Sequence, residues 1–178
     1  MDFIEELNKT MNQIKYGWAD AHGYTYPDLS GDFAKDYRLQ SPDELLKTKY
    51  GVCWDQVELE RKILAETKIK ASTYNIIHYS EDTNPKMRTH TFLLFSHNNK
   101  VYWYEHAWEK HAGTHVFNST DEAIATIQKI FIKDELQNKC DKDYIVIYEY
   151  PTPKPHLTPS EFYEHCESSS KYLPNNQQ

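Results

Sequence analysis

The chain has 178 residues, of which 39% are hydrophobic and 26% are charged, a balance that is typical of a globular protein and argues against a disordered one. Its formal net charge of −7, with no run of lysine or arginine, argues against sequence-independent binding of nucleic acid. Neither a basic, apolar leader nor an apolar stretch of roughly 20 residues is present, so we expect a cytoplasmic protein that binds no membrane and forms one domain over residues 1–178.

The first part of the chain is predicted to be helical. Apolar residues recur at helical spacing near the N-terminus. Ser41 and Pro42 have the character of a helix cap and a first helical turn. Asp, Gly, Pro and Ser are frequent before them, as is typical of irregular loops. We therefore expect helices over residues 2–15, 41–49 and 54–66, with a loop over residues 20–41.

Most of the second part is predicted to form strands. Runs of β-branched and aromatic residues are bounded by polar turns, and the segment His97 to Lys100 is short enough to join two antiparallel strands. The expected strands cover residues 70–79, 89–95, 101–107 and 143–150, and the expected helices cover residues 121–132 and 159–166. Helices followed by mainly antiparallel strands indicate the α+β class. The C-terminal tail, residues 168–178, is expected to be flexible.

Cys53 is the candidate nucleophile among the three cysteines of the chain. It follows Gly51 and directly precedes a predicted helix, so its thiol would face unpaired backbone N–H groups and the positive end of a helix dipole. Both favour the thiolate, and the same N–H groups could hold an oxyanion. A small buried cysteine that starts a core helix is the alternative. The odd number of cysteines and the absence of a C-x-x-C pair argue against a disulfide framework and a cysteine zinc site.

His90 and Glu105 are the candidate partners of that thiol. They lie in the two strands that are predicted to form a hairpin. If these strands pair through a short turn near residues 97–99, the numbers of paired residues sum to about 195 or 196, and His90 faces Glu105 or His106. A carboxylate opposite an imidazole fixes its tautomer and stabilises the imidazolium. The alternative is an exposed cross-strand pair of little consequence.

Three segments carry a resemblance to a known family: Gly51-Val52-Cys53-Trp54, Thr89-His90-Thr91-Phe92 and Trp103-Tyr104-Glu105-His106-Ala107-Trp108. In order and spacing they resemble the three motif blocks of the transglutaminase-like superfamily, over about residues 40–120. The resemblance implies a papain-like core, with N-terminal helices packed on a mainly antiparallel sheet. It also implies that Cys53 is the nucleophile, His90 the base and Glu105 the acid that orients the histidine, with no cofactor.

The activity that the resemblance implies is thiol-dependent acyl transfer on an amide bond of a peptide or protein. Water as the acceptor would give a peptidase, amidase or deamidase, and an amine would give a transglutaminase. The family usually has aspartate where this chain has Glu105, and the chain has no acidic loop suited to calcium, so calcium-dependent crosslinking is not implied. The alternative is a non-catalytic module that keeps the fold and binds a peptide or protein.

Several residues are candidates for a substrate groove. Tryptophans can line such a groove, although core packing is the more common explanation of them. The candidates are Tyr16, Trp18, Trp54, Gln56, Trp103, Trp108 and His115. The histidines at positions 106, 111 and 115 could bind zinc only if the expected loop over residues 108–115 brought them together, and nothing in their spacing requires this. We therefore expect no metal site.

Overall fold

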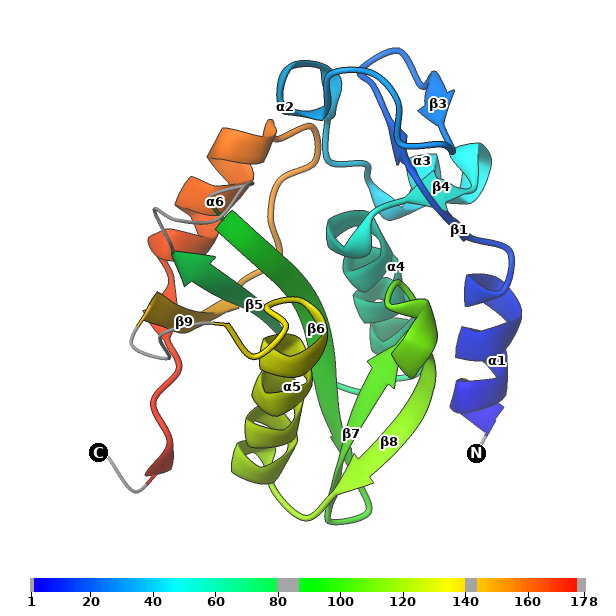
Figure 1. The fold of residues 1–178 in the computed structure, drawn as a ribbon. Coiled ribbons are helices and arrows are strands. Elements are labelled where there is room, and N and C mark those ends of the chain that lie inside the picture. Colours follow the sequence, from blue (N-terminus) through cyan, green and yellow to red (C-terminus); the bar gives the residue numbers. More distant parts are fainter. Residues whose placement is uncertain (1, 80–86, 140–143, 176–178) are drawn as a thin grey trace.

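The computed structural model describes residues 2–79, 87–139 and 144–175 (Figure 1). The helices are Asp2–Met11 (α1), Phe33–Asp36 (α2), Pro42–Thr48 (α3), Cys53–Glu66 (α4), Thr120–Asp134 (α5) and Pro159–Glu167 (α6), with a 3-10 turn at Glu109–His111 (η1). The longer strands are Ala71–Tyr79 (β5), Met87–His97 (β6), Lys100–Glu105 (β7), Gly113–Phe117 (β8) and Ile145–Tyr150 (β9). The short strands are Lys15–Tyr16 (β1), Trp18–Ala19 (β2), Thr25–Tyr26 (β3), Tyr50–Gly51 (β4) and Ser170–Lys171 (β10).

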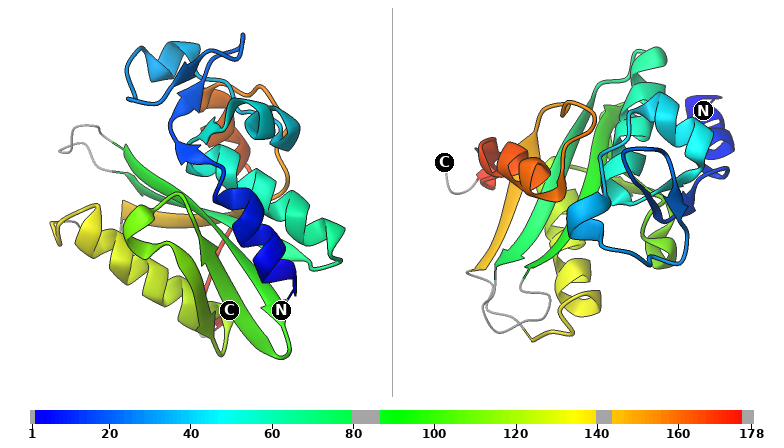
Figure 2. Two further views of the ribbon diagram at one scale, coloured as in Figure 1. Left: turned by 90° about the vertical axis from the view of Figure 1, so that its right-hand side faces the viewer. Right: turned by 90° about the horizontal axis from the view of Figure 1, so that it is seen from above.

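A six-stranded sheet in the order β10-β9-β5-β6-β7-β8 lies at the centre of the fold, and each neighbouring pair runs antiparallel. Helices α1 and α4 cover one face and α5 covers the other (Figure 2). The predicted α+β class, with N-terminal helices packed on a mainly antiparallel sheet, is confirmed. No helix in the described ranges is both long enough and apolar enough to cross a membrane.

Strand β6 contributes to the core on both faces of the sheet. Leu93 and Phe95 pack with buried residues of α1 and α4, whereas Phe92 and Leu94 pack with buried residues of α5. Side chains alternate between the two faces along a strand, so a strand covered on both faces is apolar at every position. This explains why residues 92–95 of the predicted strand form a continuous apolar run rather than an alternating pattern.

A third core cluster holds the start of α4 in place. Trp54 stacks on Phe162 of α6, with ring centroids 4.4 Å apart, and its ring also meets that of Phe33 from the segment over residues 20–41. That segment was predicted to be an irregular loop, but it also contains β3 and α2. Its aromatic residues pack against the N-terminal end of α4, so a segment with the polar composition of a loop contributes part of the hydrophobic core.

The predicted elements are present, with shifted ends. The first helix ends at Met11 rather than residue 15, and the segment over residues 108–115, expected to be a loop, contains η1 and the start of β8. The helix predicted over residues 41–49 begins with the expected capping box, in which Ser41 and Glu44 exchange hydrogen bonds.

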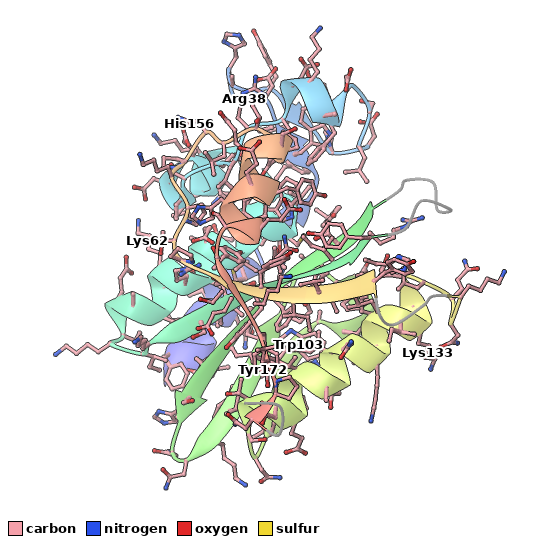
Figure 3. The ribbon with its side chains drawn as sticks, turned by 90° about the vertical axis from the view of Figure 1, so that its left-hand side faces the viewer. Arg38, Lys62, Trp103, Lys133, His156 and Tyr172 are labelled. Carbon is pink, nitrogen blue, oxygen red and sulfur yellow. The ribbon has the colours of Figure 1, made fainter. Side chains whose placement is uncertain are left out.

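The described part of the tail over residues 168–178, which we expect to be flexible, contacts the rest of the fold. Strand β10 pairs with β9, and the Tyr172 hydroxyl donates a hydrogen bond to Asp121 at the start of α5. Figure 3 shows Tyr172 and Trp103 beside α5, and both belong to the core on that face of the sheet. Residues 176–178, Cys140 and the beginning of the strand predicted from residue 143 lie outside the described residues.

Candidate active site

Cys53 is the first residue of α4, and its side chain is almost buried, with 7% of the residue exposed. Its thiol therefore lies at the end of the helix where backbone N–H groups lack intrahelical partners and the dipole is positive. Gly51 makes the tight entry to this helix possible. A Cβ atom at position 51 would lie only 2.7 Å from Cδ1 of Leu45 and 2.9 Å from Cβ of Asp55, closer than real carbon contacts.

Asp55 fixes the turn that carries Cys53. Its carboxylate is fully buried and accepts hydrogen bonds from the backbone N–H groups of Val52 (2.9 Å) and Gln40 (2.8 Å) and from the hydroxyl of Tyr37 (3.0 Å). Burial raises the pKa of Asp55 to about 7, although these hydrogen bonds act in the opposite direction. Asp55 thus connects the segment over residues 37–40 to the start of α4.

His90 and Glu105 are in direct contact. Nε2 of His90 and Oε2 of Glu105 lie 2.8 Å apart, and the second oxygen of Glu105 accepts the backbone N–H of Trp108 at 2.8 Å. Only 7% of His90 and 3% of Glu105 is exposed. The Trp108 ring covers the imidazole, with centroids 4.8 Å apart. Glu105 is therefore held at both oxygens, and it fixes the imidazole through one of the two ring nitrogens.

The register of the hairpin differs slightly from the predicted one. Paired residues of β6 and β7 sum to 197, as in Leu93 with Tyr104, rather than to 195 or 196. Asn98 and Asn99 both have positive φ angles, which is the geometry of a two-residue hairpin turn that favours asparagine. The pairing ends before His90, so its contact with Glu105 is diagonal, and the additional methylene of glutamate over aspartate adds to the reach of this side chain.

The same imidazole interacts with Cys53. Burial by itself would lower the pKa of His90, but the charge of Glu105 and hydrogen bonds with Cys53 and Glu105 raise it to about 10. Because Nε2 is bound to Glu105, Nδ1 is the ring nitrogen left for the sulfur. The three side chains singled out from the sequence therefore meet, in the order Cys53, His90, Glu105, and the arrangement favours an imidazolium beside the sulfur.

Gln56 lies one turn after Cys53 and is fully buried. Its amide N–H donates to the Gly51 carbonyl at 2.8 Å, and its amide oxygen accepts from Nδ1 of His106 at 2.7 Å. Both ends of this side chain are thus occupied by protein groups. Gln56 ties the turn before Cys53 to the residue after Glu105, and so links the two halves of the site.

A pocket of about 290 Å³ opens beside the Cys53 sulfur. Three of the candidate groove residues, Tyr16, Trp18 and Trp54, line it, together with Thr89. Sequence reasoning did not single out the remaining lining residues, which are Leu29, Phe33, Val52 and Tyr163. No motif marks them, because they come from segments that only the tertiary fold brings together.

The other candidate groove residues lie elsewhere. Trp103 is fully buried in the core below α5, where its ring stacks on that of His115 at 4.5 Å. Nε2 of His115 lies 2.8 Å from the carbonyl oxygen of His111. Trp108 lies over His90 and is therefore beside the catalytic candidates, although it does not line the pocket described above.

The clustered histidines do not converge. His106 pairs with Gln56, and His111 lies 2.6 Å from the Asp134 carboxylate. Within the described ranges, no three His, Cys, Asp or Glu side chains are placed to hold a metal ion together. Cys166, the other thiol with described coordinates, is fully buried, and burial raises its pKa to about 12.

Comparisons with known proteins assign no family. No protein-family model and no curated protein matches the sequence. Among solved structures, the chain is similar to an arylamine N-acetyltransferase from Bacillus cereus, which is described as having a unique Cys-His-Glu catalytic triad. The TM-score is 0.38 and the sequence identity 11%, over 100% of this chain and 90% of that one. At this level the similarity decides neither family nor activity.

Proposed function

We propose that the protein is a thiol-dependent acyl-transfer enzyme with a papain-like core and a Cys53-His90-Glu105 triad. The observation that supports this most strongly is the buried pair of Glu105 and His90, whose Oε2 and Nε2 atoms lie 2.8 Å apart, together with the Cys53 side chain that helps to raise the pKa of this histidine. A nucleophile, a base and a group that orients the base, in contact in that order, are the parts that acyl transfer requires.

In the proposed reaction the proton of Cys53 resides on His90, and the thiolate attacks the acyl carbon of an amide in a peptide or protein. First-turn N–H groups of α4 stabilise the oxyanion that forms on the carbonyl oxygen. When the C–N bond breaks, His90 gives its proton to the departing amine, and a thioester remains on Cys53. Glu105 stabilises the imidazolium throughout and keeps Nδ1 directed at the sulfur.

The thioester is then resolved by water or by a second amine. His90 takes the proton of the incoming nucleophile, the C–S bond breaks, and Cys53 returns to its starting state. Water gives an amidase or peptidase, and an amine gives a transamidase. We favour water as the acceptor, because the pocket that Cys53 lines, formed by described residues, has room for a single substrate group.

A binding module that retains the fold is the second candidate. The observation that favours it is the low exposure of Cys53, of which only 7% is accessible, beside a pocket with aromatic walls. Such a pocket could hold an apolar side chain of a partner peptide without chemistry. The two candidates differ in one respect that can be measured, which is the formation of a covalent bond to the sulfur.

Acylation by p-nitrophenyl acetate, followed by intact mass spectrometry and peptide mapping, tests the proposal. We expect a burst of nitrophenolate and one transient acetyl group on Cys53. Cys166→Ala should behave like the wild type, because the Cys166 thiol is buried and its pKa is raised. Cys53→Ala should show neither burst nor acetylation. A wild type that is acetylated no faster than Cys53→Ala would favour the binding module.

A further inference from the structure

The pocket beside Cys53 has walls that point to a particular kind of substrate. None of the nine lining residues is acidic or basic, and five of them form the apolar surface: Trp18, Leu29, Phe33, Val52 and Trp54. The polar side-chain groups are the hydroxyls of Tyr16, Thr89 and Tyr163, the thiol of Cys53 and the two indole N–H groups. An apolar wall with few polar groups binds uncharged, apolar ligands. The pocket therefore favours an apolar group next to the reacting sulfur.

The aromatic walls are rigid. Trp18 stacks on Tyr26 at 3.9 Å, and Phe33 stacks on Tyr37 at 4.4 Å. Trp54 is held in the same way by Phe162 of α6. Each of these three rings thus has a partner within the protein that fixes its orientation. A ligand does not have to order these rings when it binds, which lowers the entropic cost of binding.

The volume of the pocket sets the size of the group. Benzene fits an apolar protein cavity of about 150 Å³, and this pocket measures about 290 Å³. One aromatic ring on a short aliphatic linker, or an aliphatic chain of similar bulk, therefore fits.

Electrostatics disfavour an anionic group in the same place. Burial, and then the negative charges of the Cys53 thiolate and Asp55, raise the pKa of Tyr16 at the pocket wall. The same sources would oppose a carboxylate there, and none of the lining residues carries a compensating positive charge.

The position of His90 shows which half of a substrate enters the pocket. The leaving group must reach His90 to receive a proton, and His90, Glu105 and Trp108 are not among the lining residues. The acyl group stays on the sulfur, and Cys53 does line the pocket. The leaving group is thus placed on the His90 side, and the acyl side chain on the pocket side.

We propose that this pocket selects the acyl donor: the substrate carries an uncharged, apolar acyl side chain of about the size of a phenylpropionyl group. In a peptide this is a bulky apolar residue that supplies the scissile carbonyl. The inference rests on the proposed function, because it concerns the acyl group that Cys53 receives. The C–S bond forms first, and the bond to the leaving group then breaks as the leaving group takes its proton from His90.

The test compares p-nitrophenyl esters that share one leaving group and differ in the acyl group: acetyl, hexanoyl, 3-phenylpropionyl and succinyl. Rates of Cys53 acylation are corrected with Cys53→Ala and with spontaneous hydrolysis. We expect the phenylpropionyl and hexanoyl esters to react about 10- to 100-fold faster than the acetyl ester, as burial of one apolar side chain implies. The succinyl ester should be no faster than the acetyl ester.

Two variants sharpen the comparison. Leu29 lies at the rim, half exposed, so Leu29→Lys places a cation there and should raise the succinyl rate relative to the phenylpropionyl rate. Val116→Lys, at an equally exposed apolar residue on β8, is the matched control and should change neither. Equal corrected rates for all four esters would overturn the inference and leave the proposed function intact, whereas no acylation of Cys53 by any ester would overturn both.

Discussion

Replacing Glu105 by glutamine should disable the site with almost no change in shape. Glu105 accepts two hydrogen bonds, from the Trp108 N–H and from Nε2 of His90, each at 2.8 Å. An amide has only one oxygen. If that oxygen stays with Trp108, the amide N–H₂ faces Nε2, which must then be unprotonated. The ring proton moves to Nδ1, so the nitrogen that faces Cys53 can no longer accept a proton.

The size of the effect follows from the pKa of His90. Burial lowers this pKa, and the charge of Glu105, with help from Cys53, raises it from 6.5 to about 10. That rise corresponds to roughly 5 kcal/mol in favour of the imidazolium, which is the net of the favourable contributions of Glu105 and Cys53 and the opposing effect of burial. In Glu105→Gln no carboxylate opposes the effect of burial, which lowers the pKa of His90, so we expect His90 to be neutral at pH 7. Turnover should fall on the order of 10³- to 10⁴-fold.

The second-order rate of alkylation of Cys53 by iodoacetamide, measured from pH 5 to pH 10, is the assay. At pH 7 the variant should react roughly 10- to 30-fold more slowly than the wild type, because an unassisted thiol is only a few per cent ionised there. Its rate should approach that of the wild type as the pH rises. Wild-type rates and pH dependence in Glu105→Gln would refute the role given to Glu105.

Glu44→Gln is the matched control for this experiment. Glu44 also contacts Nε2 of a histidine, His156, at 2.8 Å, but both residues are exposed. Glutamine can keep the capping box that Glu44 forms with Ser41. We expect Cys53 to be alkylated in this variant at the wild-type rate. The control therefore separates the loss of any His–Glu contact from the loss of the contact beside Cys53.

Three further changes test other parts of the structure. Glu60 is buried with an unpaired oxygen, and burial, followed by the charge of Glu105, raises its pKa well above 4.5. The folded protein therefore keeps a proton that the unfolded chain releases, so the wild-type free energy of unfolding, measured in urea, should fall from pH 5 to pH 7 by up to about 1.4 kcal/mol per pH unit. The fall should be smaller in Glu60→Gln. Gly51→Ala forces a Cβ atom against Leu45 and should cost about 1–3 kcal/mol in thermal unfolding and slow acylation. Cys166→Ala should leave the rate of Cys53 alkylation, measured by mass spectrometry, unchanged.

The residues of the proposed triad could be predicted from the sequence because their signals are local. Cys53 follows a glycine and starts a helix, and His90 and Glu105 lie on strands joined by a turn of a few residues. The two asparagines of that turn even specify the register, because both residues of such a turn take positive φ angles. A turn at Asn98 and Asn99 requires paired residue numbers that sum to 197, so the predicted register was wrong by one or two residues.

The pocket could not be anticipated, because its walls are assembled from distant segments. Phe33 comes from a segment with the composition of a loop, and Tyr163 comes from α6, near the C-terminal end of the chain. No periodicity connects them. Trp103 shows the opposite error. Its place in the motif made it a candidate for the groove, but its side chain lies on the face of β7 that packs under α5. Sequence spacing defines which residues share a strand but not which face of the sheet becomes the site.

The apposition of the Cys53 sulfur and the His90 imidazole is the claim on which the proposed chemistry rests. Nitrogen-15 NMR of the histidine rings, followed against pH in the wild type and in Cys53→Ala, measures it directly. We expect His90 to stay protonated through neutral pH and to titrate near pH 10 in the wild type, and at lower pH in the variant, because the variant lacks the hydrogen bond and charge of Cys53. Identical titration of His90 in the two proteins would contradict that apposition.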